Sequence, residues 1–350
     1  MKTINGIVTK DVVEKYINGK GGSHKLALLA KYQTGNILFV GDSVIAGQGA
    51  DDDGGLPINN CLSGLLRTAI TDSGLNAGQG YQGLWERSSY YHATWSANWT
   101  VVSTGGFGIG GTSLVSNIVD ETVSFGFTGT NINLMFACNF HPSYAGGQID
   151  VAIDGGGAVR VDLTSNPMHT YTVTGLTNTA HTIIITVAVI GADEYVMFDG
   201  WYVDNDIMVM NVGLAGSDST QYVGSGSVFE YPFLDTLQPV LTIIGLGAND
   251  FNNSVAVATY QTNLTVIVTK AQAYGDVVLL DYMIDYSEDQ RLAYRQAMQA
   301  VATARSCTYV DCLLGNDSTA AIAAGYIADG HPTNTGYALM YAELEKVLFN

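Results

Sequence analysis

The stretch Ile37–Ser43, ILFVGDS, decides how this chain folds. Its apolar residues predict a buried strand, and Gly41, Asp42 and Ser43, which follow directly, are poor strand formers. In an open α/β sheet, ligands bind at the edge formed by the carboxyl ends of the strands. The stretch therefore predicts a strand of a parallel sheet that delivers the hydroxyl of Ser43 to the functional edge.

The same pattern recurs over residues 36–84 and 206–350, where apolar runs alternate with stretches of helical periodicity such as residues 255–274 and 290–305. The predicted strands are NILFVGDS, DIMVMNVG, VLTIIGLGAND, DVVLLDYM and CTYVDC. Strands and helices that alternate in this way form a parallel sheet covered by helices on both faces.

Residues 88–205 have a different sequence pattern, in which short runs rich in Val, Ile, Thr, Phe and Tyr alternate with turns rich in Gly, Asn and Asp. One of these turns, Asp154-Gly155, is a pair typical of β-hairpins. We predict an antiparallel β-sandwich inserted into the α/β chain. The predicted α/β core is discontinuous and comprises residues 1–87 and 206–350, with an N-terminal extension over 1–34.

Composition and charge exclude several classes of protein. Hydrophobic residues make up 47% of the chain and charged residues 13%, which excludes a disordered or coiled-coil protein. The net charge of −18 argues against nucleic acid or an anionic membrane as a partner, because both need basic surface. We see no secretory signal peptide and no run that spans a membrane, which leaves a phage particle, the cytoplasm and the cell exterior open as locations.

The cysteines and the run Asp51–Asp53 give little sign of a metal site. The cysteines are scattered without metal-ligand spacing, which indicates buried free thiols; they are Cys61, Cys138, Cys307 and Cys312. Adjacent aspartates can bind Ca²⁺, but a solvated loop is the commoner outcome. We therefore expect no metal and no other cofactor.

Polar residues also follow other predicted strands. Asn249 and Asp250 end one strand segment, Gly216 lies beyond another, and His331 precedes the final helix. Because the carboxyl ends of parallel strands share one edge, these residues and Ser43 are expected on the same edge of the sheet. Acyl transfer needs such a set: an activated hydroxyl, a base, and hydrogen-bond donors for the developing oxyanion.

With Gly-Asp-Ser, a glycine-bearing second block, Gly-x-Asn-Asp and a C-terminal Asp/His block in this order, the chain resembles the GDSL/SGNH hydrolases. The resemblance covers both α/β segments and implies the family's flavodoxin-like, three-layer α/β/α fold. It implies that Ser43 is the nucleophile and that its backbone N–H also serves the oxyanion hole. It further implies that His331 is the general base and that Asn249 gives a side-chain N–H to the oxyanion.

Two stretches compete for the second-block glycine, which supplies a further N–H to the oxyanion. FGIGGTS offers Gly111 and NVGLAGSDS offers Gly216. Gly216 follows a parallel-strand run and precedes Asn249 by about the length of one helical crossover, whereas Gly111 lies in the all-β region. We therefore assign Gly216, which places the inserted domain between the first and second blocks.

The fourth block departs from the family pattern. The family usually places the acid three residues before the histidine, but that position is Ala328, and Asp329 precedes His331 by only two. Either the Asp329 carboxylate orients the imidazole through a shifted loop, or a backbone carbonyl does so and leaves a Ser-His dyad. We favour the Asp329 carboxylate.

The inserted domain resembles galactose-binding-like jelly-roll modules, which often accompany carbohydrate-active enzymes. Aromatic residues near its start can stack on sugars or pack in the core; they are Trp85, Tyr90, Tyr91, Trp95 and Trp99. We therefore expect a serine esterase that removes acyl groups, above all acetyl, from a saccharide. The alternatives are a carbohydrate-binding adhesin or phage tail component with a vestigial hydrolase core, and a lipase or thioesterase of the same fold.

Overall fold

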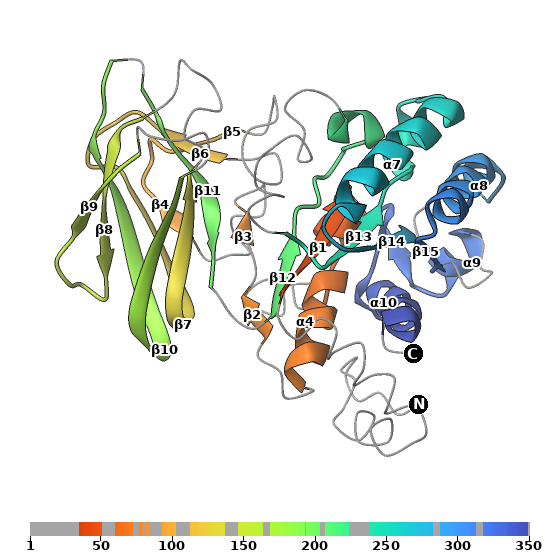
Figure 1. Cartoon of the computed structure of the whole chain (residues 1–350), viewed down its shortest axis with the longest axis horizontal. Coiled ribbons are helices and arrows are strands. Elements are labelled where there is room, and N and C mark those ends of the chain that lie inside the picture. Colours follow the sequence, from red (N-terminus) through yellow and green to blue (C-terminus); the bar gives the residue numbers. More distant parts are fainter. Residues whose placement is uncertain are drawn as a thin grey trace. The chain divides into compact units, whose positions relative to one another are not determined.

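Figure 1 shows the computed structural model of the chain. The structure describes residues 35–50, 60–72, 77–79, 82–83, 93–102, 113–136, 146–163, 169–192, 194–203, 207–223, 238–282, 288–312 and 318–348. The chain divides into two compact units: unit 1 comprises residues 1–77, 206–230 and 237–350, and unit 2 comprises residues 78–205 and 231–236. The first boundary thus falls at residue 78, where the sequence pattern places it at 88.

Unit 1 is built on a six-stranded sheet with the order β15-β14-β13-β1-β12-β2. The stretch quoted first forms the central strand β1, which pairs in parallel with β12 on one side and β13 on the other. The parallel pairing continues through β14 to β15. The bounds are β1 (Gly35–Gly41), β2 (Ala77–Gln79), β12 (Ile207–Asn211), β13 (Leu241–Gly245), β14 (Asp276–Asp281) and β15 (Thr308–Asp311). All five strands predicted for the α/β segments are therefore present.

Helices cover both faces of this sheet. In Figure 1, α7 and α8 lie on one side of it and α4 and α10 on the other; within these pairs the helices contact each other. The helices are α3 (Ser43–Ala46), α4 (Leu62–Asp72), the 3-10 helix η2 (Ser219–Tyr222), α6 (Ala248–Asn252), α7 (Val257–Gln272), α8 (Glu288–Arg305), α9 (Ser318–Ala323) and α10 (Asn334–Leu348). The predicted helices over 255–274 and 290–305 are α7 and α8, and the predicted α/β fold is confirmed.

Burial explains why these strands read as uninterrupted apolar runs. Every residue of β13 is buried, and β1 is buried from Ile37 to its end. A strand covered on both faces has no solvent side, so its sequence does not alternate. Among the described residues, no helix combines the length and apolar character that a membrane span requires.

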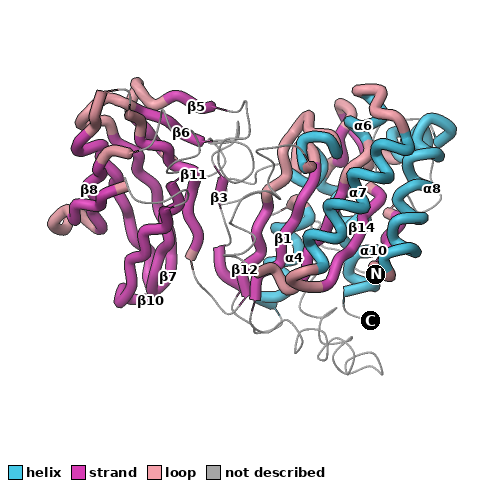
Figure 2. Tube along the Cα trace, turned by 45° about the horizontal axis from the view of Figure 1, so that its top comes forward, coloured by secondary structure: helices cyan, strands magenta, loops and turns pink. Residues whose placement is uncertain are grey.

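Unit 2 contains an antiparallel sheet of nine strands, inserted between α4 and β12 in the chain. The sheet is centred on two long strands, β7 and β10, which pair along most of their length with an irregularity between Thr174 and Thr179 (Figure 2). The strands are β3 (Gln82–Gly83), β4 (Thr94–Trp95), β5 (Thr100–Val102), β6 (Ser113–Ser116), β7 (Thr122–Phe136), β8 (Gln148–Ile153), β9 (Val159–Asp162), β10 (His169–Val189) and β11 (Val196–Tyr202). The inserted antiparallel domain is present, but its described strands form one hydrogen-bonded sheet, so a two-sheet jelly roll is not confirmed.

Unit 2 has its own hydrophobic core. Alternate residues of β7 and β10 face it, with Phe125 opposite Ile183 in the register of the two strands. The indole of Trp201 stacks on Phe125 with ring centroids 3.7 Å apart. Trp99 is buried in the same core and Trp95 packs against it, so both serve packing rather than sugar stacking. The other candidate stacking residues, Trp85, Tyr90 and Tyr91, lie outside the described residues.

Of the cysteines, Cys61 and Cys312 are buried free thiols as predicted, whereas Cys307 is free but only partly buried. Cys138 lies outside the described residues.

The predicted hairpin at Asp154-Gly155 joins β8 to β9, with left-handed φ angles of 52° and 71° at its two central residues. Asp154 also accepts a hydrogen bond from His181: its Oδ2 lies 2.7 Å from Nδ1. The other ring nitrogen, Nε2, lies 2.8 Å from the carbonyl oxygen of Thr177. Both partners accept hydrogen bonds, so the doubly protonated imidazolium is favoured; the Asp154 contact is the main cause of the raised pKa of His181.

A buried carboxyl adds to this pH sensitivity. Asp199 is 1% exposed in β11, and the Ser113 hydroxyl donates a hydrogen bond to it. Burial raises the pKa of Asp199 from 3.8 to about 8, against the opposing effect of that hydrogen bond. Folded unit 2 therefore keeps protons on Asp199 and His181 at pH values where the unfolded chain has released them.

We expect unit 2 to lose stability as pH rises from about 4 to about 8, because over this range the native state keeps the proton of Asp199 that the unfolded state releases. Asp199 contributes between its unfolded and folded pKa values, and His181 contributes as pH passes its raised native pKa. All 4 tryptophans lie in unit 2, so thermal unfolding followed by tryptophan fluorescence measures the effect.

Asp199→Asn keeps the shape of the side chain and replaces the ionisable carboxyl with an amide that does not titrate. The melting temperature of this variant should therefore depend less on pH than that of the wild type. An unchanged pH dependence in the variant would contradict the assignment to Asp199.

Candidate active site

The Gly-Asp-Ser block turns the chain sharply from β1 into α3. A Cβ on Gly41 would lie 2.0 Å from the carbonyl oxygen of Gly245, so only glycine allows β1 and β13 to approach this closely. Asp42 is the N-cap of α3, and its Oδ1 accepts a hydrogen bond of 3.0 Å from the backbone N–H of Val44. Ser43 is the first helical residue, with a side chain held at the carboxyl edge of the sheet.

His331 reaches Ser43 from the C-terminal part of unit 1. Its Nε2 lies 2.9 Å from Ser43 Oγ, which is hydrogen-bonding distance, and its Nδ1 lies 3.1 Å from the backbone carbonyl oxygen of Asp329. A carbonyl oxygen only accepts, so Nδ1 carries the hydrogen and Nε2 presents its lone pair to the serine hydroxyl. This is the tautomer that a general base for Ser43 requires.

A two-residue hairpin explains why a carbonyl orients the imidazole. β16 (Ile327–Ala328) pairs antiparallel with β17 (His331–Pro332), with Ala328 opposite His331. Asp329 and Gly330 form the turn with φ angles of 50° and 79°, and Asp-Gly is a pair favoured in type I′ turns. Asp329 precedes His331 by only two residues because the turn between β16 and β17 contains only two residues.

The geometry at Asp329 therefore differs from the prediction. Its side chain is exposed, and among the described residues no hydrogen bond joins its carboxylate to the imidazole. The residue orients His331 through its backbone carbonyl, which is the alternative left open by the sequence. The contacts seen join Ser43 Oγ to His331 Nε2 and His331 Nδ1 to the backbone carbonyl oxygen of Asp329.

Further contacts hold the segments that carry Ser43 and His331 against each other. The hydroxyl of Tyr337, in α10, lies 2.9 Å from the carbonyl oxygen of Val44 and 2.8 Å from that of Gln48. A Cβ on Gly49 would lie 2.9 Å from His331 Cβ, so glycine at this position allows the two loops to touch. Sequence patterns did not single out Tyr337 or Gly49, because each acts through distant backbone groups.

The second-block loop follows β12 and is anchored to the first block. The backbone N–H of Leu214 donates to the carbonyl oxygen of Gly41 over 2.8 Å, and the Asn211 side chain donates to the carbonyl oxygen of Ile45 over 2.7 Å. Gly216 has a left-handed φ of 79°, and a Cβ placed there meets no atom within 4 Å. Gly216 therefore lies on an open side of this loop.

The third block is joined to the second. Asn249 Nδ2 donates to the carbonyl oxygen of Ser217 over 3.0 Å, next to Gly216. Asp250 is fully buried and accepts a hydrogen bond of 3.1 Å from the backbone N–H of Ser219. Burial raises the pKa of Asp250 to about 6, against the hydrogen bonds from Ser219. These contacts bring the loops of Gly216 and Asn249 together.

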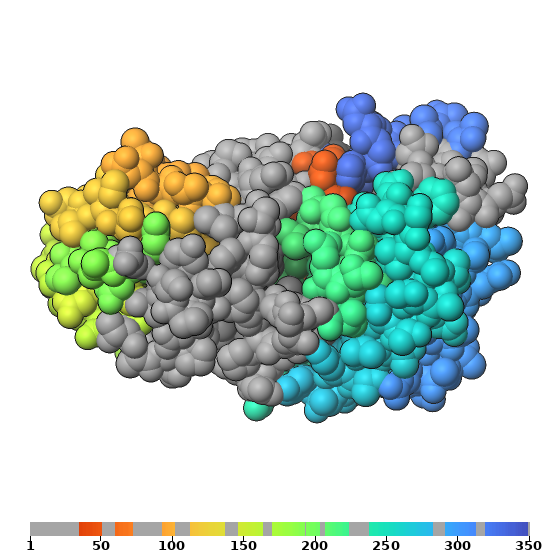
Figure 3. All heavy atoms as spheres, turned by 90° about the horizontal axis from the view of Figure 1, so that it is seen from above, coloured from red at the N-terminus to blue at the C-terminus, as the bar shows by residue number. Residues whose placement is uncertain are grey.

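Three N–H donors at this edge remain able to bind an oxyanion. No described residue accepts a hydrogen bond from the backbone N–H of Ser43 or Gly216. The Asn249 amide carries two hydrogens and uses one on Ser217. In Figure 3 the orange-red segment after β1, the green second-block segment and the blue segment near the C-terminus meet on one face of unit 1.

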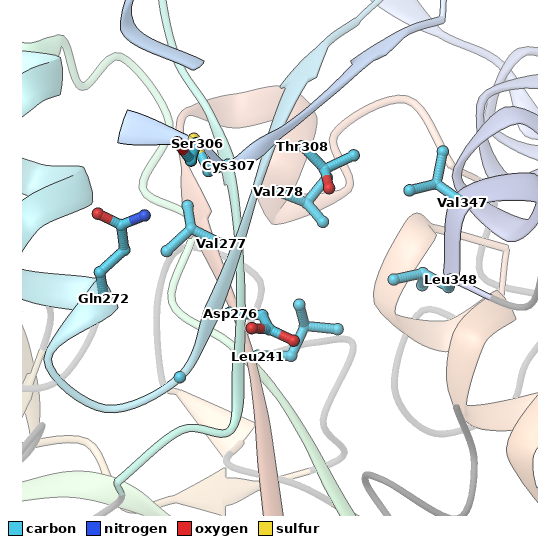
Figure 4. A pocket seen from close by; sticks show the side chains of 11 residues that line it. Leu241, Gln272, Asp276, Val277, Val278, Ser306, Cys307, Thr308, Val347 and Leu348 are labelled. Carbon is cyan, nitrogen blue, oxygen red and sulfur yellow. The ribbon is translucent and has the colours of Figure 1, made fainter. Parts of the chain in front are cut away.

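A hollow of about 540 Å³ in unit 1 lies at the other edge of the sheet. The residues that line it include the first residues of β13, β14 and β15 and the end of α10 (Figure 4). The strands of a parallel sheet all run in one direction, so this amino edge is opposite the edge that carries Ser43. The hollow is not part of the Ser43 site.

Gly111 and the run Asp51–Asp53 lie outside the described residues. Within the described ranges, no cluster of three or more His, Cys, Asp or Glu side chains could hold a metal ion.

The fold of this chain is similar to that of a known protein structure. No curated protein sequence matches the chain. A solved structure described as "Peptidoglycan O-acetylesterase in action, 5 min" aligns over 94% of this chain and 96% of its own, with a TM-score of 0.71 and 15% identity. The alignment therefore includes both units and shows a shared fold.

Two further structures align more loosely. A family two carbohydrate esterase from Clostridium thermocellum in complex with cellohexaose aligns over 73% of this chain and 98% of its own, with a TM-score of 0.33 and 14% identity. The psychrotrophic esterase EstA from Pseudoalteromonas sp. aligns over 42% of this chain and 81% of its own, with a TM-score of 0.34 and 23% identity.

The sequence model of the GDSL-like Lipase/Acylhydrolase family matches residues 197–339, which include Gly216, Asn249 and His331. Ser43 lies before the matched range, and the inserted domain separates the first block from the others in the chain. The ordered blocks and the parallel α/β fold agree with this match, so residues 197–339 of the chain are similar to the GDSL-like lipase/acylhydrolase family.

Proposed function

We propose that this protein is a serine esterase that removes small acyl groups, above all acetyl, from a saccharide by means of a Ser43–His331 dyad. The observation that carries the proposal is the distance of 2.9 Å between Ser43 Oγ and His331 Nε2, with Nδ1 occupied by a carbonyl acceptor. An inactive remnant of the fold would have no need to keep this contact.

The reaction proceeds in two acyl transfers. As Ser43 Oγ attacks the ester carbonyl carbon, its proton passes to His331 Nε2, and the N–H groups of Ser43, Gly216 and Asn249 bind the negative oxygen. The tetrahedral intermediate expels the sugar alkoxide, which takes the proton from His331. Water then attacks the carbonyl carbon of the acyl-enzyme and gives a proton to His331. The second tetrahedral intermediate expels Ser43 Oγ, which takes that proton from His331, and the carboxylic acid is released.

The imidazolium formed in each step is stabilised by the Asp329 carbonyl dipole rather than by a carboxylate. This hydrogen bond fixes the tautomer and ring orientation, which are the main tasks of the third member of a triad.

Asp329→Asn is therefore expected to lower kcat by less than about tenfold, equivalent to about 1.4 kcal/mol. Asparagine keeps the backbone carbonyl and accepts the left-handed φ of 50° at this position. Steady-state kinetics with p-nitrophenyl acetate measure the effect. A loss of about a thousandfold, with the fold intact, would show that the carboxylate takes part after all.

Two observations support a saccharide ester as the substrate. The structure that aligns over both units is, by its description, a peptidoglycan O-acetylesterase. In addition, the chain carries a second unit whose antiparallel sheet the acyl-transfer machinery does not use. We take O-acetylated saccharide as the substrate class on these grounds.

A panel of esters tests the proposal. The purified protein should release acetate from O-acetylated peptidoglycan or acetylated oligosaccharides and prefer p-nitrophenyl acetate to the butyrate and octanoate. Rates that rise with acyl chain length would instead make the protein a lipase or thioesterase. Glycan binding without turnover of any ester would make it a binding protein with an inactive core.

A further inference from the structure

Tyr282 is a fully buried residue that directly follows β14 and lies beneath the proposed site. Its hydroxyl donates a hydrogen bond to Oδ2 of Asp42, the residue before the nucleophile. The same hydroxyl accepts a hydrogen bond of 3.3 Å from the backbone N–H of Ala248, the residue before Asn249. One hydroxyl group thus joins the segment that carries Ser43 to the segment that carries Asn249.

The tyrosine ring is itself held in place. Arg291, in α8, donates from Nη1 to the carbonyl oxygen of Tyr282 over 2.9 Å, and its guanidinium carbon lies 5.6 Å from the ring centroid. Arg291 is fixed in turn by Asp281, at 2.5 Å. The Tyr282 hydroxyl therefore occupies a fixed point in unit 1.

The burial of the Asp42 carboxyl makes the hydrogen bond from Tyr282 important. It is fully buried, and burial raises its pKa to about 7, while the hydrogen bonds from Tyr282 and Val44 and the charge of Arg291 lower it. A buried carboxylate that loses a donor is strongly destabilised, so the surrounding loop would rearrange to find another. That loop carries Ser43 and its backbone N–H.

We propose that Tyr282 is a positioning residue that sets the Ser43 N–H and the Asn249 amide at the spacing that stabilises the oxyanion. The proposal rests on the function proposed above. Oxyanion donors stabilise the transition state only if they are already in place, and a displacement of about 1 Å can cost about a hundredfold in rate. Because Tyr282 does not touch the substrate, its loss should affect the transition state and leave substrate binding unchanged.

Tyr282→Phe tests this, because it removes one oxygen atom and keeps the buried ring. With p-nitrophenyl acetate, we expect kcat to fall by about tenfold to a hundredfold while KM changes by less than about twofold. The matched control is Tyr294→Phe, which removes a hydroxyl that bonds the carbonyl oxygen of Val255 in the same unit. This control should keep kcat within about twofold of the wild type.

A double variant distinguishes positioning of the oxyanion donors by Tyr282 from a general loss of structural stability. If Tyr282 acts through Asn249, then adding Tyr282→Phe to Asn249→Ala should lower kcat by much less than it does in the wild-type background. A wild-type kcat in Tyr282→Phe, an equal loss in Tyr294→Phe, or full additivity with Asn249→Ala would each overturn the inference. An active wild type with any of these results leaves the proposed function standing, whereas a wild type that hydrolyses no ester overturns both.

Discussion

Ser43→Ala should abolish ester hydrolysis, with kcat/KM reduced by at least about four orders of magnitude. The variant removes the only atom that forms the acyl bond in the proposed mechanism and leaves the fold unaffected, since alanine is accommodated at the first position of α3. Two assays measure the loss, each with an enzyme-free blank: hydrolysis of p-nitrophenyl acetate and release of acetate from an acetylated saccharide.

His331→Ala should cost a similar amount, and the double variant should be no worse than either single variant, because nucleophile and base act as one unit. Asp329→Asn serves as the matched control on the same hairpin, since it changes a neighbouring side chain and keeps the carbonyl that His331 uses. Substantial turnover by Ser43→Ala would place the chemistry elsewhere in the molecule.

The second large effect concerns stability. Asp281, at the end of β14, has a side chain that is 3% exposed and binds two arginines: its oxygens lie 2.5 Å from Arg291 Nη2 and 2.6 Å from Arg295 Nε. The hydroxyl of Tyr309 donates to the same carboxylate over 3.0 Å. Asp281→Ala leaves two nearly buried guanidinium groups without their shared anion, so we expect a loss of about 3–5 kcal/mol in the free energy of unfolding.

Asp311 provides the matched control. It lies opposite Asp281 in the register of β14 and β15, but its side chain is 43% exposed and it approaches Arg295 only to 4.0 Å. Asp311→Ala should cost less than about 1 kcal/mol. The described helices all belong to unit 1, so denaturant unfolding followed by helical circular dichroism reports on the unit that contains both residues. Equal effects from the two variants would contradict the role assigned to Asp281.

The sequence was informative where one local pattern determines structure. Uninterrupted apolar runs predicted the strands of the parallel sheet, because strands covered on both faces have no polar side. The residues just beyond those strands then predicted Ser43 and Asn249, since the carboxyl ends of parallel strands share an edge. His331 followed from its block, and the structure places it against Ser43.

The sequence was less informative where contacts span long distances. Tyr282 and Tyr337 act on backbone groups and side chains that lie far away in the chain, so no spacing rule points to either. The strand order of unit 2 likewise depends on hydrogen bonds between strands that are far apart in the chain. The role of Asp329 was accessible in principle, because Asp329-Gly330 is the same hairpin pair that correctly predicted the turn at Asp154.

Labelling with a fluorophosphonate tests most directly whether His331 activates Ser43 as the nucleophile. The reagent reacts with a hydroxyl whose proton a base removes, so peptide mass spectrometry should find one label per chain, on Ser43, with loss of esterase activity in proportion to labelling. Ser43→Ala and His331→Ala should remain unlabelled, while Asp329→Asn should label at close to the wild-type rate. Full labelling at another residue, or activity that survives complete labelling of Ser43, would contradict the account.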